Sequence, residues 1–541
     1  MTEDDSQFHK RLAVPAPRLC PHCRQQRRLT HYNERALYRN TCAACSKNVI
    51  SIFAPDSPST VFCSSCWWSD ANDTLQYGQE YVPGQSFFEQ LYQLRHRVPQ
   101  LALVNDNEVR STNCQYTNNF ASGKNCYCVY CTWHNEDCLY SSYIDKSRSC
   151  CDCTFCIDSE LLYECVDCRS CYSCVGVHAS MQSRDCCFSY DLRNCSNCTY
   201  CYGLRNQQYC YNNEQLSKEE YTDRMVELGL ETRSGYSSAL HRFEQLITEA
   251  PRRFMSETGS TDCSGHMLEY CKNVRSSFDV INSQDCRYLY VVGPDGRDCY
   301  DVTCSGQMEL CYDSLSVDDC YRARFCGFTW KSNHVTYCFD CHSCSNLFGC
   351  AALRRNEYCI LNKQYSKEDY TALVKLIEEE MRMSGEWGQF FPGRFSLFGY
   401  NESAAQVFQP LAEKAAVDSG FRWYAAEADT VAVRGPNTVP EVISEVGDEI
   451  CETAFGCSGC GKAYKLVLQE LEFYRKLKIA LSELCQNCRH GRRLAFRNPL
   501  QLWERPCSQC ATEVLSSYAP DCVAEVVLCD ECYPAYLTRD H

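Results

Sequence analysis

Fourteen cysteines toward the two ends of the chain are arranged as Cys-x-x-Cys pairs, a pattern typical of zinc knuckles. Zinc takes four thiolate or imidazole ligands in a tetrahedron, and one Cys-x-x-Cys turn presents two thiolates from a single bend. Two such turns a hairpin apart therefore make a closed structural site. The spacing predicts three Zn2+ sites, formed by Cys42/Cys45 with Cys63/Cys66, by Cys457/Cys460 with Cys485/Cys488, and by Cys507/Cys510 with Cys529/Cys532.

The remaining pair, Cys20/Cys23, is also a candidate pair of metal ligands. It corresponds to Cys485/Cys488, but nothing before residue 20 matches the Cys457/Cys460 knuckle. The pair could combine with Cys63/Cys66 in a different partition, use His22 or a remote ligand, or bind no metal. The sequence leaves these alternatives open.

Two arginine triplets beside the knuckles are the candidate contacts to nucleic acid. They are Arg24, Arg27, Arg28 and Arg489, Arg492, Arg493. Basic side chains bind phosphate groups, but solvated charges beside a zinc knuckle are the simpler interpretation. The whole chain carries a net charge of −16, which is unfavourable for a protein dedicated to coating nucleic acid.

Most of the 48 cysteines lie in the middle of the chain, and many recur about every twelve residues, as Cys126, Cys138 and Cys150 do. The run from Cys165 to Cys174 looks superficially like a set of iron–sulfur ligands, but it lacks the usual spacing and following proline. In an extended chain successive residues point to alternate faces, so these thiols would not all converge. Packing in a core is the favoured interpretation, with further metal sites and disulfides as alternatives.

No motif for catalysis accompanies these cysteines. The histidines form no His-Glu-x-x-His motif, and neither a nucleophile elbow nor a glycine-rich phosphate loop is present. A catalytic zinc needs an open coordination position, whereas each predicted site is closed by four cysteines. The sequence therefore predicts a protein that is not an enzyme and has no evident small-molecule substrate.

Two internal duplications indicate the elements that position the cysteines. At a shift of 465 residues the first two N-terminal pairs, the arginine triplet and Ala54-Pro55-Asp56 coincide with C-terminal counterparts. At a shift of 149, cysteines of the inner part coincide: Cys114, Cys150, Cys195, Cys201 and Cys210 with Cys263, Cys299, Cys344, Cys350 and Cys359. Each inner copy ends at a predicted helix start, Ser217 to Glu220 and Ser366 to Asp369, where an acidic residue follows a small capping residue.

Short β-prone triplets broken by Asn, Asp and Ser cannot bury a face alone, but stacked coils of them can, with small thiols inside. We therefore expect a mainly β fold with helical linkers, in which zinc-ribbon modules at both ends flank two cysteine-rich β-solenoid-like repeats. The expected boundaries are an N-terminal ribbon module (1–80), a helical linker (81–106), a first repeat, called field 1 (107–221), a second linker (222–255), a second repeat, called field 2 (256–370), a helix with an irregular connector (371–450), and a C-terminal double ribbon module (451–541).

Length and composition indicate the number of domains and the cellular compartment. A chain of 541 residues is expected to form several domains. No apolar run approaches the roughly 20 residues that span a bilayer, and the acidic N-terminus does not resemble a secretory signal. Reduced thiols and a cytoplasmic location are expected, because cytosolic thiols are kept reduced; a virion is the alternative.

Several segments resemble a family of uncharacterised, cysteine-rich, zinc-ribbon-flanked proteins of candidate-phyla bacteria and some large DNA viruses. They include FAPDSPSTVFCSSCWWSD, FFEQLYQLRHRVPQLALVN, Asn125-Cys126-Tyr127, Leu204-Arg205-Asn206, LNKQYSKEDY, GEWGQFFP, FGYNES and LQELEFYRKLKIAL. The resemblance covers nearly the whole chain and implies zinc binding without an established activity. Some members carry a CoA-transferase label, but this sequence shows no CoA-transferase feature.

The sequence thus predicts a non-enzymatic, zinc-binding structural or interaction protein with a stiff cysteine-ladder scaffold. Its expected partner is another protein or a second copy of the chain, and no membrane is involved. Two alternatives remain: a nucleic-acid-binding protein that uses the arginine-rich ribbons, and a viral particle or surface component stabilised by disulfides.

Overall fold

The computed structural model describes residues 2–107, 109–293, 295–309, 312–315, 318–425, 438–522, 524 and 526–538. About 28% of the chain is strand and 26% is helix. Regular strand is therefore less dominant than the expected mainly β class implies, because much of the pairing runs through single bridges between short triplets. Residues 426–437 of the expected connector lie outside the described residues.

Helices lie mostly outside the two fields. The described α-helices are α1 (Glu3–Arg11), α2 (Pro21–Leu29), α3 (Ser64–Trp68), α4 (Phe87–Arg97), α5 (Lys218–Glu227), α6 (Arg233–Glu249), α7 (Lys367–Ser384), α8 (Ala404–Phe408), α9 (Glu413–Asp418), α10 (Leu468–Leu477), α11 (Gln486–Ala495) and α12 (Cys532–Leu537). Short 3-10 helices are η1 (Thr74–Tyr77), η2 (Gly393–Phe395), η3 (Tyr400–Glu402), η4 (Ile443–Glu445) and η5 (Asp448–Glu452). Among the described residues, no helix is both long and apolar enough to cross a bilayer.

Strands of the ribbon modules, together with β4 and β14 of the linkers, form small hairpins and parallel pairs. They are β1 (Tyr38–Thr41), β2 (Asn48–Ser51), β3 (Val61–Phe62), β4 (Gln100–Leu101), β14 (Arg252–Arg253), β29 (Phe455–Gly456), β30 (Ala463–Tyr464), β31 (Trp503–Pro506), β32 (Glu513–Ser516) and β33 (Val527–Leu528). The hairpins β1–β2, β29–β30 and β31–β32 are antiparallel. Each carries one Cys-x-x-Cys pair at its turn.

Field 1 is built from parallel pairs between residues twelve apart. This offset runs from Thr112, which bridges to Lys124, to Arg193, which bridges to Arg205. Its strands are β5 (Asn118–Ala121), β6 (Tyr130–Trp133), β7 (Thr154–Ile157), β8 (Glu160–Tyr163), β9 (Val166–Arg169), β10 (Tyr172–Val175), β11 (Ser196–Thr199) and β12 (Gln208–Tyr211), closed by β13 (Glu214–Gln215). They pair at the same offset as β5–β6, β7–β9, β8–β10 and β11–β12.

Field 2 repeats this pairing, but its first repeat is one residue shorter, with Glu257 paired to Leu268, and a later repeat is one residue longer. Gly265 pairs with Ser277 at an offset of twelve, but Tyr290 pairs with Thr303, thirteen residues on. The strands are β15 (Glu257–Thr258), β16 (Gly265–Glu269), β17 (Lys272–Arg275), β18 (Ser277–Ile281), β19 (Gln284–Arg287), β20 (Tyr290–Val292), β21 (Tyr300–Glu309), β22 (Tyr312–Leu315), β23 (Asp318–Tyr321), β24 (Ala323–Arg324), β25 (Asn333–Thr336), β26 (Ser345–Phe348), β27 (Glu357–Ile360) and β28 (Lys363–Gln364). The shorter first repeat explains why Cys286 corresponds to Cys138 at a shift of 148, and the later added residue restores the shift of 149 at Cys150 and Cys299.

A left-handed residue recurs at nearly every third described position of both fields. Asn125, Cys128 and Cys131, for example, have φ of 52°, 54° and 55°. An L-residue in this conformation is disfavoured by roughly 1–2 kcal/mol, and least so for Asn and Asp. This requirement explains the Asn and Asp residues that interrupt the β-prone triplets in the sequence.

The residue after each left-handed position points into the field, and this is where most field cysteines lie. Cys126, Cys138 and Cys150 are fully buried in one column. The Sγ of Cys126 lies 3.4 Å from the carbonyl oxygen of Lys124 and 3.6 Å from that of Asn135. Ser159 occupies an equivalent position and donates to the Ile157 carbonyl at 2.9 Å. The interior of each field is therefore lined by small side chains that can donate to the backbone.

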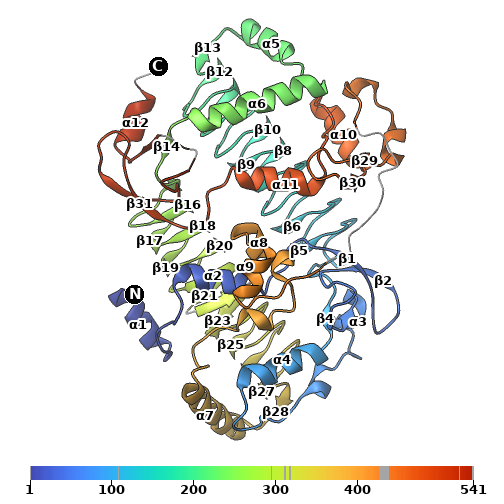
Figure 1. The fold of residues 1–541 in the computed structure, drawn as a ribbon, viewed down its shortest axis with the longest axis vertical. Helices are drawn as coiled ribbons and strands as arrows, with labels where there is room; N and C mark the ends of the chain where they lie inside the picture. Colours follow the sequence, from blue (N-terminus) through green and yellow to red (C-terminus); the bar gives the residue numbers. More distant parts are fainter. Residues whose placement is uncertain are drawn as a thin grey trace.

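The two ribbon modules cross over to the opposite field. The helices of the N-terminal module lie against field 2, where Phe8 of α1 stacks on Tyr300 with ring centroids 3.7 Å apart. The helices of the C-terminal module lie against field 1, where Tyr140 donates to Glu470 of α10 at 2.9 Å. In Figure 1 field 1 runs from the middle right to the top and field 2 from the middle left to the bottom, with α2 and α11 near the centre.

Each module also pairs with a short strand just before the field that its helices do not cover. Strand β3 of the N-terminal module pairs in parallel with β4, just before field 1. Strand β33 of the C-terminal module pairs with β14, just before field 2. Each module therefore joins both fields, and the arrangement has an approximate two-fold character that follows the two duplications.

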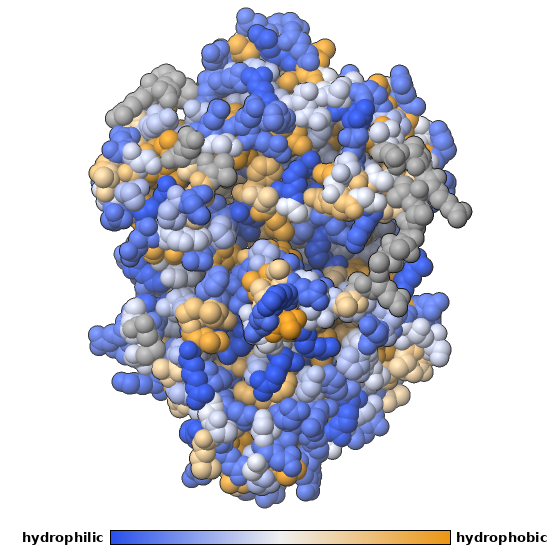
Figure 2. All heavy atoms as spheres, viewed as in Figure 1, coloured by the Kyte–Doolittle hydropathy of each residue, from blue (hydrophilic) through white to orange (hydrophobic). Residues whose placement is uncertain are grey.

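The core has separate parts for the two fields and a third part between them. One buried cluster is made mainly of the inward cysteines and aliphatic residues of field 1, and another of those of field 2. A larger cluster, rich in Tyr and Phe, joins residues on the outer faces of the fields to the helices packed against them. Figure 2 shows polar residues over most of the visible face, with apolar residues gathered toward the hollowed middle.

Candidate metal centres and a central cavity

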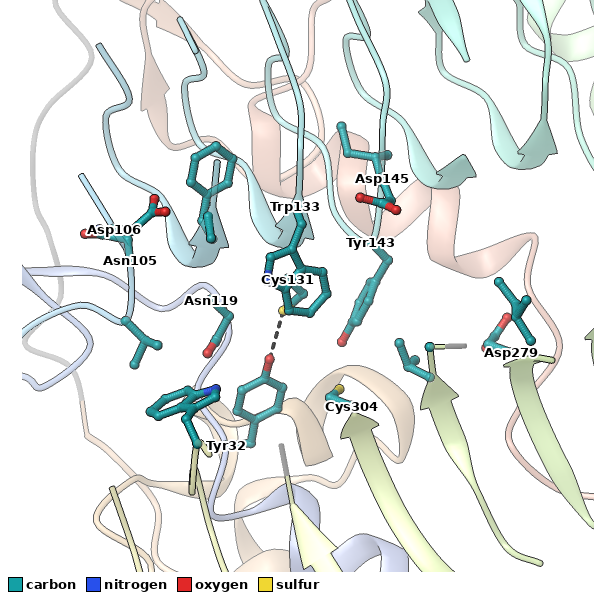
Figure 3. Close-up of a pocket in the computed structure, with 18 of the residues that line it drawn as sticks. Tyr32, Asn105, Asp106, Asn119, Cys131, Trp133, Tyr143, Asp145, Asp279 and Cys304 are labelled. Atoms are coloured by element: carbon teal, nitrogen blue, oxygen red, sulfur yellow. Dashed lines mark hydrogen bonds between the residues drawn. The ribbon is translucent and has the colours of Figure 1, made fainter. Parts of the chain in front are cut away.

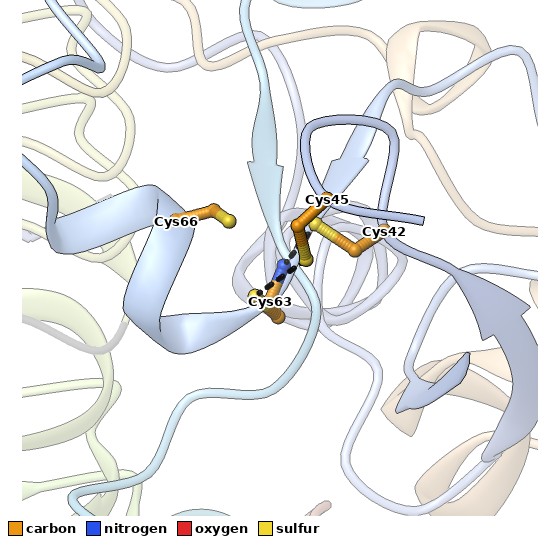
Figure 4. Close-up of side chains that lie close together, drawn as sticks. All are labelled: Cys42, Cys45, Cys63 and Cys66. Atoms are coloured by element: carbon orange, nitrogen blue, oxygen red, sulfur yellow. Dashed lines mark hydrogen bonds between the residues drawn. The ribbon is translucent and has the colours of Figure 1, made fainter. Parts of the chain in front are cut away.

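The first four-cysteine group joins the β1–β2 turn to the start of α3. Cys42 and Cys45 lie in the turn, and Cys63 and Cys66 lie at the helix start (Figure 4). The four Sγ atoms are all within 4.8 Å of one another. The Sγ atoms of Cys45 and Cys63 are 3.8 Å apart. This separation equals the edge of a tetrahedron with Zn–S bonds of about 2.3 Å, which is about 3.8 Å.

The C-terminal module contains two further groups of the same form. One combines Cys457 and Cys460, at the β29–β30 turn, with Cys485 and Cys488, at the start of α11; the other combines Cys507 and Cys510 with Cys529 and Cys532. The Sγ atoms of Cys460 and Cys485 are 3.8 Å apart, and those of Cys510 and Cys529 are 3.7 Å apart. The structure thus brings together the same sets of four cysteines that the spacing predicts.

Each group contains a thiol prepared for the thiolate state. The backbone N–H of Cys485 donates to Cys457 Sγ at 3.2 Å, and that of Cys529 donates to Cys507 Sγ at 3.3 Å. Burial opposes ionisation, but these N–H donors lower the pKa of Cys457 and of Cys507 to about 6. Because the thiolate is the form that binds metal, the donor sets fit zinc.

Cys20 and Cys23 lie outside these groups. Both are exposed at the start of α2, where the backbone N–H of Cys23 donates to Cys20 Sγ at 3.4 Å. Among the described residues, no third His, Cys, Asp or Glu lies close enough to form a metal group with them.

The arginine triplets contact the protein's own carboxylates, whereas the sequence favoured solvated charges and left nucleic-acid contact as the candidate role. Arg24 and Arg28 are buried against Asp301, at 2.8 and 3.2 Å. Arg28 also reaches Asp313 at 2.6 Å, and Arg27 is paired with the same carboxylate. Their guanidinium groups are not presented to a phosphate in solvent.

The C-terminal triplet makes equivalent contacts with field 1. Arg489 and Arg493 are buried against Asp152, at 3.2 and 2.7 Å, and Arg492 pairs with Glu164. Asp152 and Glu164 coincide with Asp301 and Asp313 at the shift of 149, just as the arginines coincide at 465. One duplication therefore repeats the arginines, and the other repeats the carboxylates that pair with them. This correspondence is the signal in the sequence that could have shown how the modules dock on the fields.

A cavity of about 1060 Å³ lies between the facing sides of the two fields. Residues twelve apart line its field 1 side, among them Trp133, Asp145 and Ile157. Asp279 and Cys304 line its field 2 side (Figure 3). The sequence gives no sign of this cavity, because its lining comes from single positions of successive repeats and from distant segments.

Charged residues connect the fields beside the cavity. Arg169 of field 1 pairs with Glu269 of field 2 at 2.8 Å. Arg497, from the C-terminal module, reaches Asp167 at 3.1 Å and is also paired with Asp279. These ion pairs fix the spacing of the cavity walls.

A polar cluster lies at another part of the cavity wall, where residues of the N-terminal module meet residues of field 1. The hydroxyl group of Tyr32 lies 3.0 Å from Cys131 Sγ (Figure 3). Tyr143 donates to Glu34. Burial raises the pKa of Glu34 to about 7, against the lowering effect of the Tyr143 hydrogen bond.

No protein-family model matches the chain, and no curated protein matches it.

Proposed function

We propose that the protein is a non-enzymatic, zinc-binding scaffold in which three structural zinc ions brace two cysteine-lined β-solenoids. The observation that carries this proposal is that all four Sγ atoms of each group lie within 4.8 Å of one another. In each group one Sγ pair is 3.7–3.8 Å apart, which is the edge of a zinc–thiolate tetrahedron. In each group all four ligands are protein thiols, so no coordination position is left for a substrate.

The three groups lie where the ribbon modules join the fields. Cys63 follows β3, which pairs beside field 1, and Cys529 follows β33, which pairs beside field 2. Cys485 precedes α11, whose arginines bind field 1. Zinc binding to finger peptides contributes about 10–16 kcal/mol per site, so the ions would hold the crossed arrangement together.

The twelve-residue parallel offset supports a solenoid for each field. With left-handed residues at nearly every third described position, one repeat has four short sides and four inward positions. Stacked repeats of this kind give a stiff, extended surface, which suits a protein partner or a second copy of the chain.

The alternatives have less support. Nucleic-acid binding loses the six arginines on which it was based, because they are paired with carboxylates of the fields. Membership of the zinc-ribbon-flanked family, a cytoplasmic location and a viral role stay predictions.

Metal removal tests the proposal. Treatment of the full chain with a zinc chelator is expected to raise amide hydrogen exchange in residues 38–68, 455–495 and 503–538, while the inner amides of both fields stay protected. The matched control is the same chelator with excess zinc. Unchanged exchange in all three segments after complete metal removal would contradict the proposed bracing role.

A second candidate function is ligand binding in the central cavity. Trp68 and Trp133 are 45% and 50% exposed, and both line this cavity. Exposed indole faces provide stacking surfaces for flat or sugar-like ligands. Carboxylates outnumber basic groups in the lining, which favours a neutral polyhydroxylated ligand over an anionic one.

This candidate can be tested by tryptophan fluorescence with maltoheptaose, cellopentaose and chitopentaose as probes. We expect at least one sugar to change the emission of the native chain, and Trp68→Ala with Trp133→Ala to abolish the change. Trp423 lies outside the cavity lining, so Trp423→Phe is the control and should keep the sugar-induced change in emission. No change with any of the three probes would remove this candidate.

A further inference from the structure

The start of α2 exposes two thiols beside an exposed leucine. Cys20 and Cys23 are both exposed, and Leu19 retains 39% of its surface. An exposed leucine alone is ordinary. Two thiols at one turn beside it form a surface that can bind metal.

The duplicated copy of this surface is covered. Leu484, Cys485 and Cys488 coincide with Leu19, Cys20 and Cys23 at the shift of 465. The capping residues have the same backbone conformation, with φ −65° and ψ 161° at Cys20 and φ −65° and ψ 159° at Cys485. The backbone conformation at the cap therefore does not separate the two copies, although only Cys20 accepts a side-chain hydrogen bond there, from the Cys23 N–H.

The β29–β30 turn provides the cover in the C-terminal copy. Its Ser458 N–H donates to the Glu483 carbonyl at 3.0 Å, and its Cys457 and Cys460 complete the four-cysteine group. A Cβ added at Gly459 would lie 3.0 Å from Leu484 Cδ2 and 3.3 Å from Cys488 Sγ. The glycine turn thus sits directly on the leucine and the helix-start thiol.

All three four-cysteine groups follow one rule. Each combines a pair from a hairpin turn with a pair that follows a short strand or begins a helix. The hairpin pairs of the described residues are all used in this way, and Cys20/Cys23 is the helix-start pair left over. The two ligands that it lacks are of the hairpin type.

The helix that carries the pair is held firmly. Arg24 and Arg28, on the first two turns of α2, are buried in ion pairs with Asp301. Arg489 and Arg493 hold α11 in the same way. The two thiols are therefore presented from a fixed helix end, as in the completed copy.

We propose that Leu19, Cys20 and Cys23 form a docking site for a Cys-x-x-Cys hairpin knuckle of a second polypeptide, joined through a shared zinc ion. The inference rests on the proposed zinc-binding function. The two chains would each supply two thiolates, and the partner would place a glycine turn on Leu19. Binding would be strictly zinc-dependent, because two thiolates from either side alone leave the ion half coordinated.

The test uses the chain's own knuckle as the probe, a synthetic peptide of residues 453–466. Full-length protein carrying its resident zinc is mixed with the peptide and one added equivalent of zinc, and the mixture is measured by native mass spectrometry and calorimetry. The expected result is a complex of one chain, one peptide and one zinc beyond those of the protein alone. A peptide with Ser at both cysteine positions should bind at least 100-fold more weakly.

Cys20→Ser with Cys23→Ser should abolish the complex and leave the resident zinc count unchanged, since these thiols are exposed and outside the three groups. Leu19→Asp should weaken binding without removing a ligand. Absence of the ternary complex, or binding that survives the double serine variant, would overturn the proposal. A protein dimer that shares zinc through Cys20 and Cys23 without peptide would overturn the choice of partner. In each case the zinc count of the protein alone reports separately on the three resident groups.

Discussion

Replacement of Asp301 by Asn should release the helices of the N-terminal module from field 2. Asp301 is fully buried and accepts from Arg24 at 2.8 Å and Arg28 at 3.2 Å. The substitution removes the negative charge but keeps the size of the side chain. It also suits the backbone, because Asp301 has a φ of 58° and Asn tolerates the left-handed region.

The same field offers a matched control three residues away. Asp298 also has a positive φ, 49°, and also pairs with an arginine of the N-terminal module, Arg11, at 3.1 Å. These side chains are 39% and 51% exposed. Removing one partner of a buried pair costs about 3–5 kcal/mol, whereas an exposed pair contributes about 0–1 kcal/mol.

Hydrogen exchange of α1 and α2 measures the difference locally. Asp301→Asn should raise the opening equilibrium of these helices by at least about a hundredfold, as about 3 kcal/mol corresponds to two factors of ten. Asp298→Asn should change it by less than about fivefold. Equal effects of the two substitutions would refute the conclusion that the buried arginine–carboxylate network docks the module.

Three further predictions concern the fields and the polar cluster. Cys165→Ser should lower the free energy of unfolding by about 1 kcal/mol or less, because serine occupies equivalent positions. Cys165→Phe should lower it by more than about 3 kcal/mol through overpacking. Urea denaturation followed by circular dichroism measures both. Gly265→Ala should destabilise field 2 by more than about 3 kcal/mol, since the added Cβ would lie 1.8 Å from the Ser277 carbonyl oxygen. The control Gly420→Ala should cost only about 1 kcal/mol, because the space around Gly420 is open. The raised pKa of Glu34, about 7, means that the folded state holds this proton more tightly, so stability should fall as pH rises from 4.5 through 7, by up to about 3 kcal/mol. Denaturation between pH 5.5 and 8 should show this slope in the native chain and a smaller one in Glu34→Gln; equal slopes would exclude Glu34 as its source.

The sequence was most informative where structure is local or repeated. A Cys-x-x-Cys turn has nearly fixed geometry, so spacing alone could assemble Cys42 with Cys63. The recurrence of Cys126, Cys138 and Cys150 reported one column of a repeat, although the strand content is lower than a mainly β fold implies. The left-handed residues explain the Asn and Asp between them.

Docking between distant segments was much harder to predict. Arg24 and Asp301 are 277 residues apart, and the arginines by themselves suggested solvent or phosphate. Their burial depends on how two fields and two modules cross, which no local pattern reports. The pairing could be inferred only by combining two observations: the arginines repeat at a shift of 465, and the carboxylates repeat at a shift of 149.

The cavity was unpredictable for a related reason. Its walls consist of one position in each of several repeats, such as Trp133 and Asp145, and those positions carry no common residue type. Its size depends on cross-field ion pairs such as Arg169 with Glu269.

The most direct test of the central claim is a count of bound zinc by native mass spectrometry of the full chain, purified without chelators. The proposed function predicts three zinc ions per chain, and the loss of one ion in each of three variants: Cys42→Ser with Cys45→Ser, Cys457→Ser with Cys460→Ser, and Cys507→Ser with Cys510→Ser. A metal-free native chain that keeps its folded spectrum, or variants that keep all three ions, would contradict it.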